Sequence, residues 1–347
     1  MKTKTVKIGN ITIGGGSRIA VQSMTNIPAH NTAAVTEQIN RLAEAGCDIV
    51  RFAVPDRETA ENVDKIVGAV SVPLVADIHF DYRLALMCIE RGISKIRINP
   101  GNIGGEDRAA AVAKAAKAKG IPIRIGVNGG SLEKGLLEKC GGNLAMAMVE
   151  SAKRHIEILN RYDFDDIVLS MKSSDVRTTI AAYRLAHESS NYPLHLGVTE
   201  AGTVKSGIVK SAIGIGSLLA DGIGDTIRVS LTGDPVKEVE AARLILRALD
   251  MEPDSIQVVS CPTCGRTKID LISIANRVTE ETEKLKGKLK VAVMGCVVNG
   301  PGEAKDADIG IAGGDGCAVL FKKGEIIKKL PENEIVDALM DEIRRMI

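Results

Sequence analysis

The fold of this chain is constrained most strongly by a repeated alternation of short apolar runs and amphipathic helical segments, which fills roughly its first 250 residues. Eight apolar runs recur, at Ile19–Met24, Ile49–Val54, Leu74–His79, Lys95–Asn99, Ile123–Asn128, Ile167–Lys172, Leu194–Thr199 and Thr226–Leu231. Continuous apolar strands that alternate with helices are typical of a parallel sheet that is covered on both faces. Eight such units predict an α/β fold with a (β/α)8 barrel of the TIM type.

Helical segments separate most of these runs. We expect helices over Ala33–Ala45, Thr59–Ala69, Asp107–Lys119, Asn143–Asn160, Val176–Ser189, Lys205–Leu219 and Pro235–Leu249. Thr32 and Asp175 belong to the residue types that cap helix N-termini, and each precedes such a segment. A short hairpin from Val6 to Ile13 comes before the first run. The alternative fold is an open, doubly wound sheet, but no Gly-x-Gly-x-x-Gly follows the first run to support a dinucleotide-binding fold.

The pattern changes after Leu249, where a polar segment at positions 250–255 has the character of a linker. Beyond it we expect strands at Ile256–Ser260, Lys290–Met294, Ile309–Ala312, Ala318–Phe321 and Glu325–Lys328, and helices at Leu271–Lys286 and Glu332–Met346. This mixture predicts a smaller α+β domain. We therefore expect a barrel domain at residues 1–252 and a second domain at residues 253–347.

Composition excludes several classes of function. The formal net charge is +1, and aromatic residues make up 2% of the chain with no Trp, which argues against a nucleic-acid-binding protein. The N-terminal residues lack the apolar stretch of a signal peptide, and no apolar run approaches the roughly 18 residues of a membrane span. We expect a cytoplasmic protein that binds no membrane. The seven cysteines, an odd number, favour metal binding or reactive thiols over a disulfide framework.

Five of the apolar runs carry a basic residue inside the run or at its end. These residues are Arg51, Arg97, Arg124, Lys172 and Arg228. A single one would usually be a structural, salt-bridged side chain, because buried Arg and Lys are rare unless they are paired. Five together favour a shared cationic pocket at the C-terminal mouth of the barrel, where such folds place their active sites. The planar guanidinium suits phosphate oxygens, so the set indicates a ligand with more than one negative charge, such as a diphosphate.

Other polar side chains share strand faces with these cations. The pairs are Arg97 with Asn99, Arg124 with Asn128, Arg228 with Ser230, and Asp77 with His79. Gly-rich loops follow several of the strands and can bring backbone N–H groups close to anionic oxygens. Glu200 lies in the loop after the seventh run, where it can act as a general acid or base or simply pair with an arginine. Asp77 and His79 are likewise either catalytic or structural.

A second constellation consists of cysteines near the C-terminal end. Cys261 and Cys264 form a Cys-x-x-Cys pair, and Cys296 lies on a later loop that is rich in Gly and Pro. Three thiols suit zinc, which would want a fourth Cys or His, or an iron–sulfur cluster, which can take an oxygen ligand on its remaining iron. The second domain has no His, Cys317 is expected inside a strand, and Glu303 is the nearest acidic residue. The spacing favours an iron–sulfur cluster and leaves zinc as the alternative.

Eight stretches of sequence, taken in order, carry a more specific resemblance. They are VQSMTN at 21–26, VR at 50–51, ADIHF at 76–80, RINPGN at 97–102, RIGVNGGS at 124–131, GVTEAG at 197–202, SCPTCGR at 260–266 and MGCVVNGPGE at 294–303. With them the chain resembles the bacterial 4-hydroxy-3-methylbut-2-en-1-yl diphosphate synthase family (GcpE) in its two-domain form. The match runs along nearly the whole chain and shows no departure at the motif positions.

The resemblance implies an activity, a cofactor and partners. It implies reductive opening of 2-C-methyl-D-erythritol 2,4-cyclodiphosphate to (E)-4-hydroxy-3-methylbut-2-enyl diphosphate, with loss of water, in the non-mevalonate isoprenoid pathway. The electrons would come from flavodoxin or ferredoxin. By similarity, a [4Fe–4S] cluster would be ligated by Cys261, Cys264, Cys296 and Glu303. Family members work as head-to-tail homodimers, in which the cluster domain of one chain covers the barrel of its partner.

The same resemblance assigns candidate roles to individual residues. Substrate binding is expected from Arg51, Arg97, Asn99, Arg124, Asn128, Ser131, Thr199, Lys205, Arg228, Ser230 and Asn299. Lys172 joins this set from the strand pattern alone. The candidate catalytic residues are Glu200 and Glu303, with Glu200 a candidate proton donor to the departing hydroxyl, together with Asp77 and His79 from the strand pattern. The competing function is that of a phosphate-binding barrel with a structural zinc clip and no redox chemistry.

Overall fold

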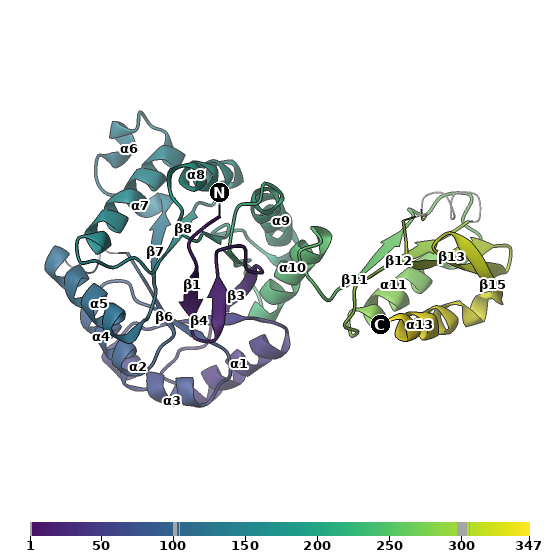
Figure 1. The fold of residues 1–347 in the computed structure, drawn as a ribbon, viewed down its shortest axis with the longest axis horizontal. Coiled ribbons are helices and arrows are strands. Elements are labelled where there is room, and N and C mark those ends of the chain that lie inside the picture. Colours follow the sequence, from purple (N-terminus) through teal and green to yellow (C-terminus); the bar gives the residue numbers. More distant parts are fainter. Residues whose placement is uncertain (1, 100–102, 104, 297–303, 305) are drawn as a thin grey trace. The chain divides into compact units, whose positions relative to one another are not determined.

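The computed structural model describes residues 2–99, 103, 105–296, 304 and 306–347. The chain divides into two compact units, Met1–Leu249 and Asp250–Ile347, which are described separately below (Figure 1).

The first unit contains an eight-stranded parallel sheet whose strand order follows the chain. Its strands are β3 (Ala20–Met24), β4 (Ile49–Ala53), β5 (Leu74–Asp77), β6 (Lys95–Ile98), β7 (Ile123–Asn128), β8 (Ile167–Lys172), β9 (His195–Leu196) and β10 (Thr226–Ile227). β10 pairs with β3, and a parallel bridge between Leu169 and Leu194 brings β8 against the start of β9. The sheet therefore closes on itself, which confirms the TIM-type barrel and shows that the open doubly wound alternative was wrong.

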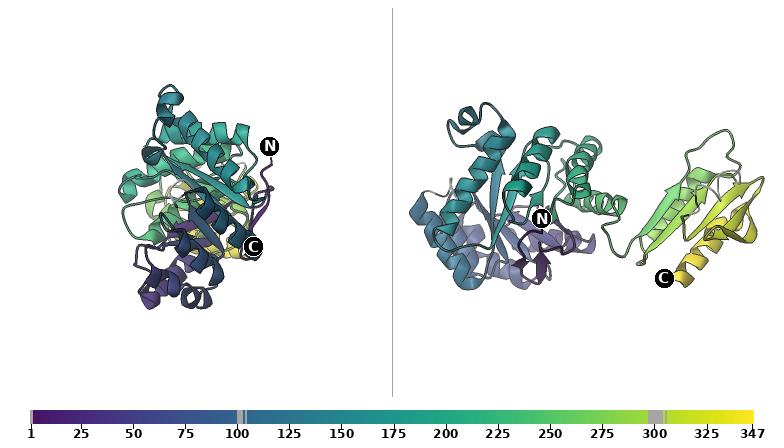
Figure 2. Two further views of the ribbon diagram at one scale, coloured as in Figure 1. Left: turned by 90° about the vertical axis from the view of Figure 1, so that its left-hand side faces the viewer. Right: turned by 45° about the horizontal axis from the view of Figure 1, so that its top comes forward.

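Helices form the outer layer around these strands, as two further views show (Figure 2). They are α1 (Thr32–Glu44), α2 (Arg57–Glu61), α3 (Val63–Gly68), α4 (Tyr82–Glu90), α5 (Glu106–Lys119), α6 (Leu136–Lys139), α7 (Leu144–Asn160), α8 (Val176–Ser189), α9 (Val204–Ala220) and α10 (Pro235–Ala248), with a 3-10 turn η1 (Gly129–Ser131). Of the expected N-caps, Asp175 is confirmed, whereas Thr32 is wrong because the side chain of Asn31 accepts the N–H of Ala34.

Two other differences from the predicted elements have local causes. The helix expected at Thr59–Ala69 is divided at Asn62, whose side-chain amide donates to the Glu58 carbonyl. The last two barrel strands are shorter than the apolar runs that predicted them. After β10, the N–H of Leu231 donates to the side chain of Glu238 instead of to a neighbouring strand.

A two-stranded hairpin covers the N-terminal end of the barrel. β1 (Val6–Ile8) and β2 (Ile11–Ile13) pair in antiparallel register, and their apolar side chains form one buried cluster with Ala20, Ile49 and Val75. These three residues lie at or near the first positions of their strands. Because this end is filled by apolar side chains, a polar site is left to the opposite end, where the strands terminate.

The second unit is a five-stranded sheet with helices on one face (Figure 1). The strand order is β11 (Ile256–Ser260), β12 (Leu289–Met294), β13 (Ile309–Gly314), β14 (Cys317–Lys322) and β15 (Glu325–Pro331). β11, β12 and β13 pair in parallel, whereas β14 pairs antiparallel with both β13 and β15. Alternate residues of β12 enter different cores, since Val291 and Val293 pack with the helices while Ala292 and Met294 pack with Phe321.

The helices of this unit are shorter than predicted. α11 (Leu271–Thr282) ends four residues before the expected Lys286, because Lys284 and Leu285 donate to carbonyls three residues back in a tight turn. The closing helix α13 (Ile335–Met346) is preceded by a 3-10 turn, η2 (Glu332–Glu334). Among the described helices of both units, none has the length and apolar character needed to span a membrane.

Candidate functional site

Basic side chains from four strands and from the segment after β10 come together in the barrel. Arg51 comes from β4, Lys95 and Arg97 from β6, Arg124 from β7, Lys172 from β8, and Arg228 follows β10. All but Arg228 are buried, and the Arg228 side chain is only 15% exposed. Lys95 was not among the predicted site residues, although it lies two positions before Arg97 and therefore on the same strand face.

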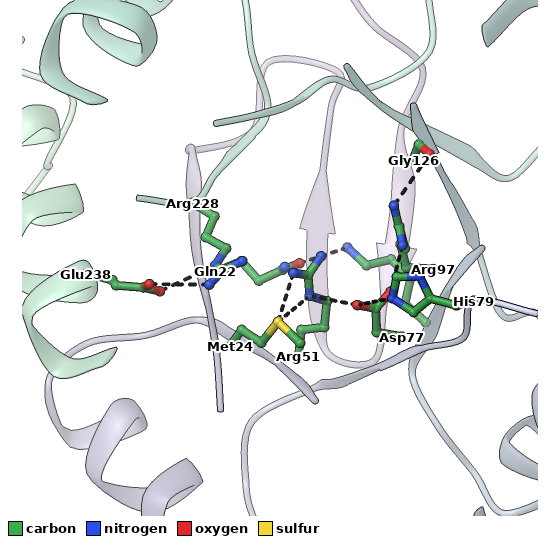
Figure 3. Close-up of polar contacts among 10 residues, drawn as sticks. Gln22, Met24, Arg51, Asp77, His79, Arg97, Gly126, Arg228 and Glu238 are labelled. Carbon is green, nitrogen blue, oxygen red and sulfur yellow. Dashed lines mark hydrogen bonds and ion pairs between the residues drawn. The ribbon is translucent and has the colours of Figure 1, made fainter. Parts of the chain in front are cut away.

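Asp77, at the end of β5, ties two of these cations together (Figure 3). Its carboxylate lies 3.7 Å from Arg51 Nε and 3.2 Å from Arg97 Nη1, and His79 Nε2 approaches it to 3.4 Å. Burial acts to raise the pKa of Asp77, but Arg51, His79 and Arg97 together hold it well below its usual value. Asp77 is therefore anionic throughout the physiological range, so the geometry suits it to holding arginines in place.

Around Arg51, positively charged side chains outnumber the negatively charged ones. Burial lowers the pKa of Arg51 to about 10, with Asp77 opposing the shift and Arg228 adding to it. Its Nε, which also faces Asp77, and its Nη2 lie 3.1 and 2.8 Å from the thioether Sδ of Met24, a weak acceptor. An anionic ligand would relieve this shortage of acceptors and of negative charge.

Several buried donors in the pocket have no acceptor within the described part of the chain. Arg124 is 1% exposed, and its Nε and Nη1 are both unpartnered, as is Nε of Arg97. A buried donor without a partner costs about 1–3 kcal/mol, so such groups are expected where a ligand or water completes the set. Burial, with Arg51 and Arg97 adding to it, also lowers the pKa of Arg124 well below its ordinary value.

Two glycines make room for these side chains. A Cβ on Gly126 would lie 2.8 Å from Cζ of Arg97 and would overlap its Nε, while Arg97 Nη2 reaches the Gly126 carbonyl at 3.5 Å. A Cβ on Gly197 would lie 3.1 Å from Lys172 Nζ. Burial, followed by Arg228 and Arg124, lowers the pKa of Lys172 well below its ordinary value. The small residues therefore permit a dense layer of cations that a typical apolar barrel interior would exclude.

The remaining predicted residues differ in burial. Asn99 is buried, and Asn128, Thr199 and Ser230 are half-buried. His79, Ser131, Glu200 and Lys205 are exposed, Lys205 in the first turn of α9. Glu200 has a φ of 51°, a left-handed conformation that is uncommon for a residue with a side chain and is concentrated at functional sites. The binding and catalytic roles of these residues stay predictions.

Three cysteines of the second unit follow two neighbouring parallel strands. Cys261 comes directly after β11, Cys296 comes two residues after β12, and the strands are in register at Ser260 and Val293. The Gly295 N–H donates to Cys261 Sγ at 3.2 Å, so this sulfur already accepts a backbone hydrogen bond. Cys264 is exposed and its own N–H donates to Thr267 Oγ1 at 3.3 Å.

The donor chemistry at these strand ends fits a soft metal centre. The backbone N–H of Arg266, helped by its side chain, lowers the pKa of Cys264 and so favours the thiolate, the form that ligates metals. Among the described residues, no three His, Cys, Asp or Glu side chains are close enough to enclose a metal ion in this conformation. Asn299 and Glu303 lie outside the described residues. Cys317 begins β14 and is half-buried, so the interior strand position expected for it was wrong.

Comparisons with known proteins bear on both units. A family model described as the GcpE TIM-barrel domain matches residues 3–243, and one described as the GcpE protein C-terminal domain matches residues 257–345. The chain is 59% identical to a protein of Ruminiclostridium cellulolyticum, over 99% of this chain and 98% of the relative. It is 56% identical to one of Clostridium tetani, over 99% of each. Both are named 4-hydroxy-3-methylbut-2-en-1-yl diphosphate synthase (flavodoxin).

Solved structures with low sequence identity share the barrel fold. A dihydropteroate synthase from Stenotrophomonas maltophilia aligns with a TM-score of 0.53 at 13% identity, over 72% of this chain and 100% of that one. A Yersinia pestis dihydropteroate synthase aligns with a TM-score of 0.52 at 16% identity, with the same coverage. At this identity the likeness concerns the fold alone. The two family models and the full-length relatives extend the match to the second unit, and the chain therefore belongs to the GcpE family of 4-hydroxy-3-methylbut-2-en-1-yl diphosphate synthases.

Proposed function

We propose that this enzyme opens 2-C-methyl-D-erythritol 2,4-cyclodiphosphate reductively to (E)-4-hydroxy-3-methylbut-2-enyl diphosphate, within the non-mevalonate isoprenoid pathway. The conversion consumes two electrons and two protons and releases one water. The relatives named above carry the synthase activity in their names. The observation that supports it most is the buried cationic mouth of the barrel, whose unpartnered guanidinium donors suit a diphosphate.

The barrel residues would bind and orient the diphosphate. Arg51, Arg97, Arg124 and Arg228 supply planar donors, and Lys172 adds a compact charge on the same interior surface. We favour Lys172 over Lys205 as the lysine of this site, because Lys172 is buried beside the arginines whereas Lys205 is exposed on α9. Asn99, Asn128, Ser131, Thr199, Ser230 and Asn299 complete the proposed binding set. Fixing the diphosphate would hold the reacting carbon in one orientation.

We assign proton delivery to exposed residues that follow the barrel strands. Glu200 is exposed and sits in the left-handed backbone conformation that directs the chain after β9, so it is our candidate donor to the departing hydroxyl. Asp77 remains ionised and serves to hold Arg51 and Arg97. His79, in contact with Asp77, is the second candidate for a proton-transfer role.

The electrons require a group that amino-acid side chains do not provide. Cys261, Cys264 and Cys296, with Glu303 as the fourth ligand, would hold a [4Fe–4S] cluster, which supplies electrons at low potential when bound. We propose reduced flavodoxin as the donor, as in the relatives' names, with ferredoxin as the alternative. We further propose a cytoplasmic homodimer in which residues 253–347 of one chain cover the barrel, residues 1–252, of the other.

The decisive experiment is anaerobic turnover of the cyclic diphosphate with a chemical reductant. We expect a brown protein with about four irons and four sulfides per chain and with product formation that depends on the reductant. A colourless protein that contains one zinc and binds phosphate without turnover would contradict the proposal. That outcome would instead support the phosphate-binding barrel with a zinc clip.

A further inference from the structure

A buried carboxylate on α10 stands at the edge of the cationic mouth and belongs to none of the roles assigned above. Glu238 is 4% exposed, and donors from β3 and from the segment after β10 converge on it. Figure 3 shows its contact with Arg228. Its Oε2 accepts from Ser23 Oγ at 2.9 Å and from Arg228 Nε at 3.3 Å. Its Oε1 accepts from Arg228 Nη2 at 3.3 Å and from the Leu231 N–H at 3.0 Å.

The position of Glu238 in its helix shows that these contacts are not incidental. α10 begins at Pro235 after the N-cap Asp234, and Glu238 lies in the first turn on the face that also buries Ala241, Ala242 and Ile245. A carboxylate on an otherwise apolar face is costly unless it is paired and hydrogen-bonded. Glu238 is paired and hydrogen-bonded because this face of α10 lies against β3 and the segment after β10.

The contacts fix the direction of Arg228. A guanidinium has five N–H donors, and the bonds to Glu238 occupy the Nε–H and one Nη2–H in the plane of the fork. The remaining Nη1 edge is left to meet a ligand. Ser23 and the Leu231 N–H hold the carboxylate in turn, so Arg228 is fixed relative to β3 as well as to its own strand.

We propose that Glu238 is a positioning residue of the diphosphate site, acting through Arg228; the proposal rests on the function proposed above. It parallels the role of Asp77, which holds Arg51 and Arg97. A purely electrostatic role would act in the opposite direction, because a carboxylate beside the mouth repels an anion. The sign of the change in affinity therefore separates positioning from simple charge compensation.

The test compares Glu238→Gln with Glu240→Gln in the full-length protein purified anaerobically with its cluster. Gln offers one acceptor oxygen, so in either orientation its NH2 faces one Arg228 donor and disrupts the fork. We expect the Kd for inorganic pyrophosphate and the KM for the cyclic diphosphate to rise about tenfold, with kcat changing less than about twofold. Glu240 is exposed on the same helix and pairs with Lys237, so its variant should match the wild type. Tighter or unchanged binding by Glu238→Gln would overturn the proposal.

A double-mutant cycle with Arg228→Ala tests whether the effect passes through the arginine. In the Arg228→Ala background, Glu238→Gln should cause no further loss of pyrophosphate affinity. Independent, additive losses would show a general structural role and would refute positioning. Ser23→Ala removes one donor to Glu238 and keeps the Arg228 fork, so it should weaken binding only about two- to threefold. This milder variant serves if Glu238→Gln does not fold, and an affinity equal to the wild type would then count against the proposal.

The outcomes for Glu238 and for the proposed function are distinguishable. A wild-type protein that neither binds pyrophosphate nor turns over the cyclic diphosphate would refute the function, and the Glu238 proposal with it. A wild-type protein that does both, combined with unchanged Glu238→Gln affinity, would refute Glu238 alone.

Discussion

The cationic site of the barrel and the cysteine site are both built on neighbouring parallel strands, but they are organised by different means. In the barrel, Asp77 is in register with Arg97, and Arg97 with Arg124, so ladder pairing places the charges side by side. In the second unit, the last pair of the ladder between β11 and β12 is Ser260 with Val293, and the thiols follow these strands on loops. The described thiols do not by themselves enclose an ion.

The difference shows two routes to a functional site. The barrel cations are held before any ligand arrives, by buried carboxylates and by the rigid sheet, which lowers the cost of ordering on binding. The three thiols are expected to bind one metal centre, and this binding is expected to order them. Loss of one barrel cation should therefore have a graded effect, whereas loss of one thiol should remove the whole metal-dependent activity.

The largest effect is expected from Cys264→Ser. Serine is a poor ligand for a soft metal centre, so turnover with a chemical reductant should fall at least about 100-fold, while pyrophosphate still binds to the barrel. The measurements are iron and sulfide content, turnover and the Kd for pyrophosphate. Cys140→Ser, at a half-buried cysteine in the first unit, is the control and should keep the cluster. Full activity in Cys264→Ser would remove this cysteine from the ligand set.

A smaller, graded effect is expected from Arg97→Ala. The substitution removes one buried guanidinium and should weaken pyrophosphate binding by ~1–3 kcal/mol, or roughly 5- to 150-fold. Cluster content should be unchanged, because Arg97 belongs to the barrel. The control is Arg184→Ala, which removes an exposed arginine that pairs with Asp221. Equal affinity in Arg97→Ala and wild type would mean that Arg97 is structural.

Rigidity of the barrel site can be tested without removing a charge. Gly126→Ala places a methyl group against the Arg97 guanidinium, so the arginine must move from the position that Asp77 and the Gly126 carbonyl define. We expect pyrophosphate affinity to fall about fivefold and stability to fall by about 1–3 kcal/mol, as for other overpacked sites. Gly68→Ala, where the added Cβ meets open space at the end of α3, should leave affinity unchanged and should not lower stability. Unchanged affinity in Gly126→Ala would show that the site adapts.

The sequence predicted the barrel well because its signals are local and periodic. Apolar runs identified all eight strands, and the position of Arg51, Arg97 and Arg124 within those runs sufficed to place them in one pocket. Glu238 could not be found in this way, because helix periodicity places it among apolar residues without showing which strands that face meets. Its partners Ser23 and Arg228 are distant in sequence or on another element, so the contact exists only after closure of the barrel.

The cysteine site was predicted from residue type and spacing, and these say little about loop conformation. Cys317 shows the limit, because its apolar neighbours suggested an interior strand position whereas it begins β14 half-buried. Cys261 differs, since its Sγ accepts the Gly295 N–H across two adjacent strands and is thus anchored by the sheet. Loop-borne ligands depend on the group they bind, and that dependence is not encoded in local periodicity.

The last prediction concerns stability alone, with no effect on the cluster or on pyrophosphate binding at issue, and probes whether a buried lysine is held as a neutral amine. Lys95 is fully buried, with Gln22 Oε1 at 3.5 Å, and burial, with Arg124 and Arg51 adding to it, lowers its pKa well below 10.5. Between the lowered pKa and 10.5 the unfolded chain binds more protons than the folded one, so Lys95 makes folding more favourable as pH rises through that window. The Lys95→Met variant lacks this pH-dependent contribution to the free energy of unfolding. Its stability relative to wild type should therefore fall with rising pH, by up to about 1.4 kcal/mol per pH unit, in urea unfolding at pH 7 to 9.5. A stability difference that stays constant with pH would show that Lys95 keeps its proton in the folded protein across this window, and would contradict the lowered pKa.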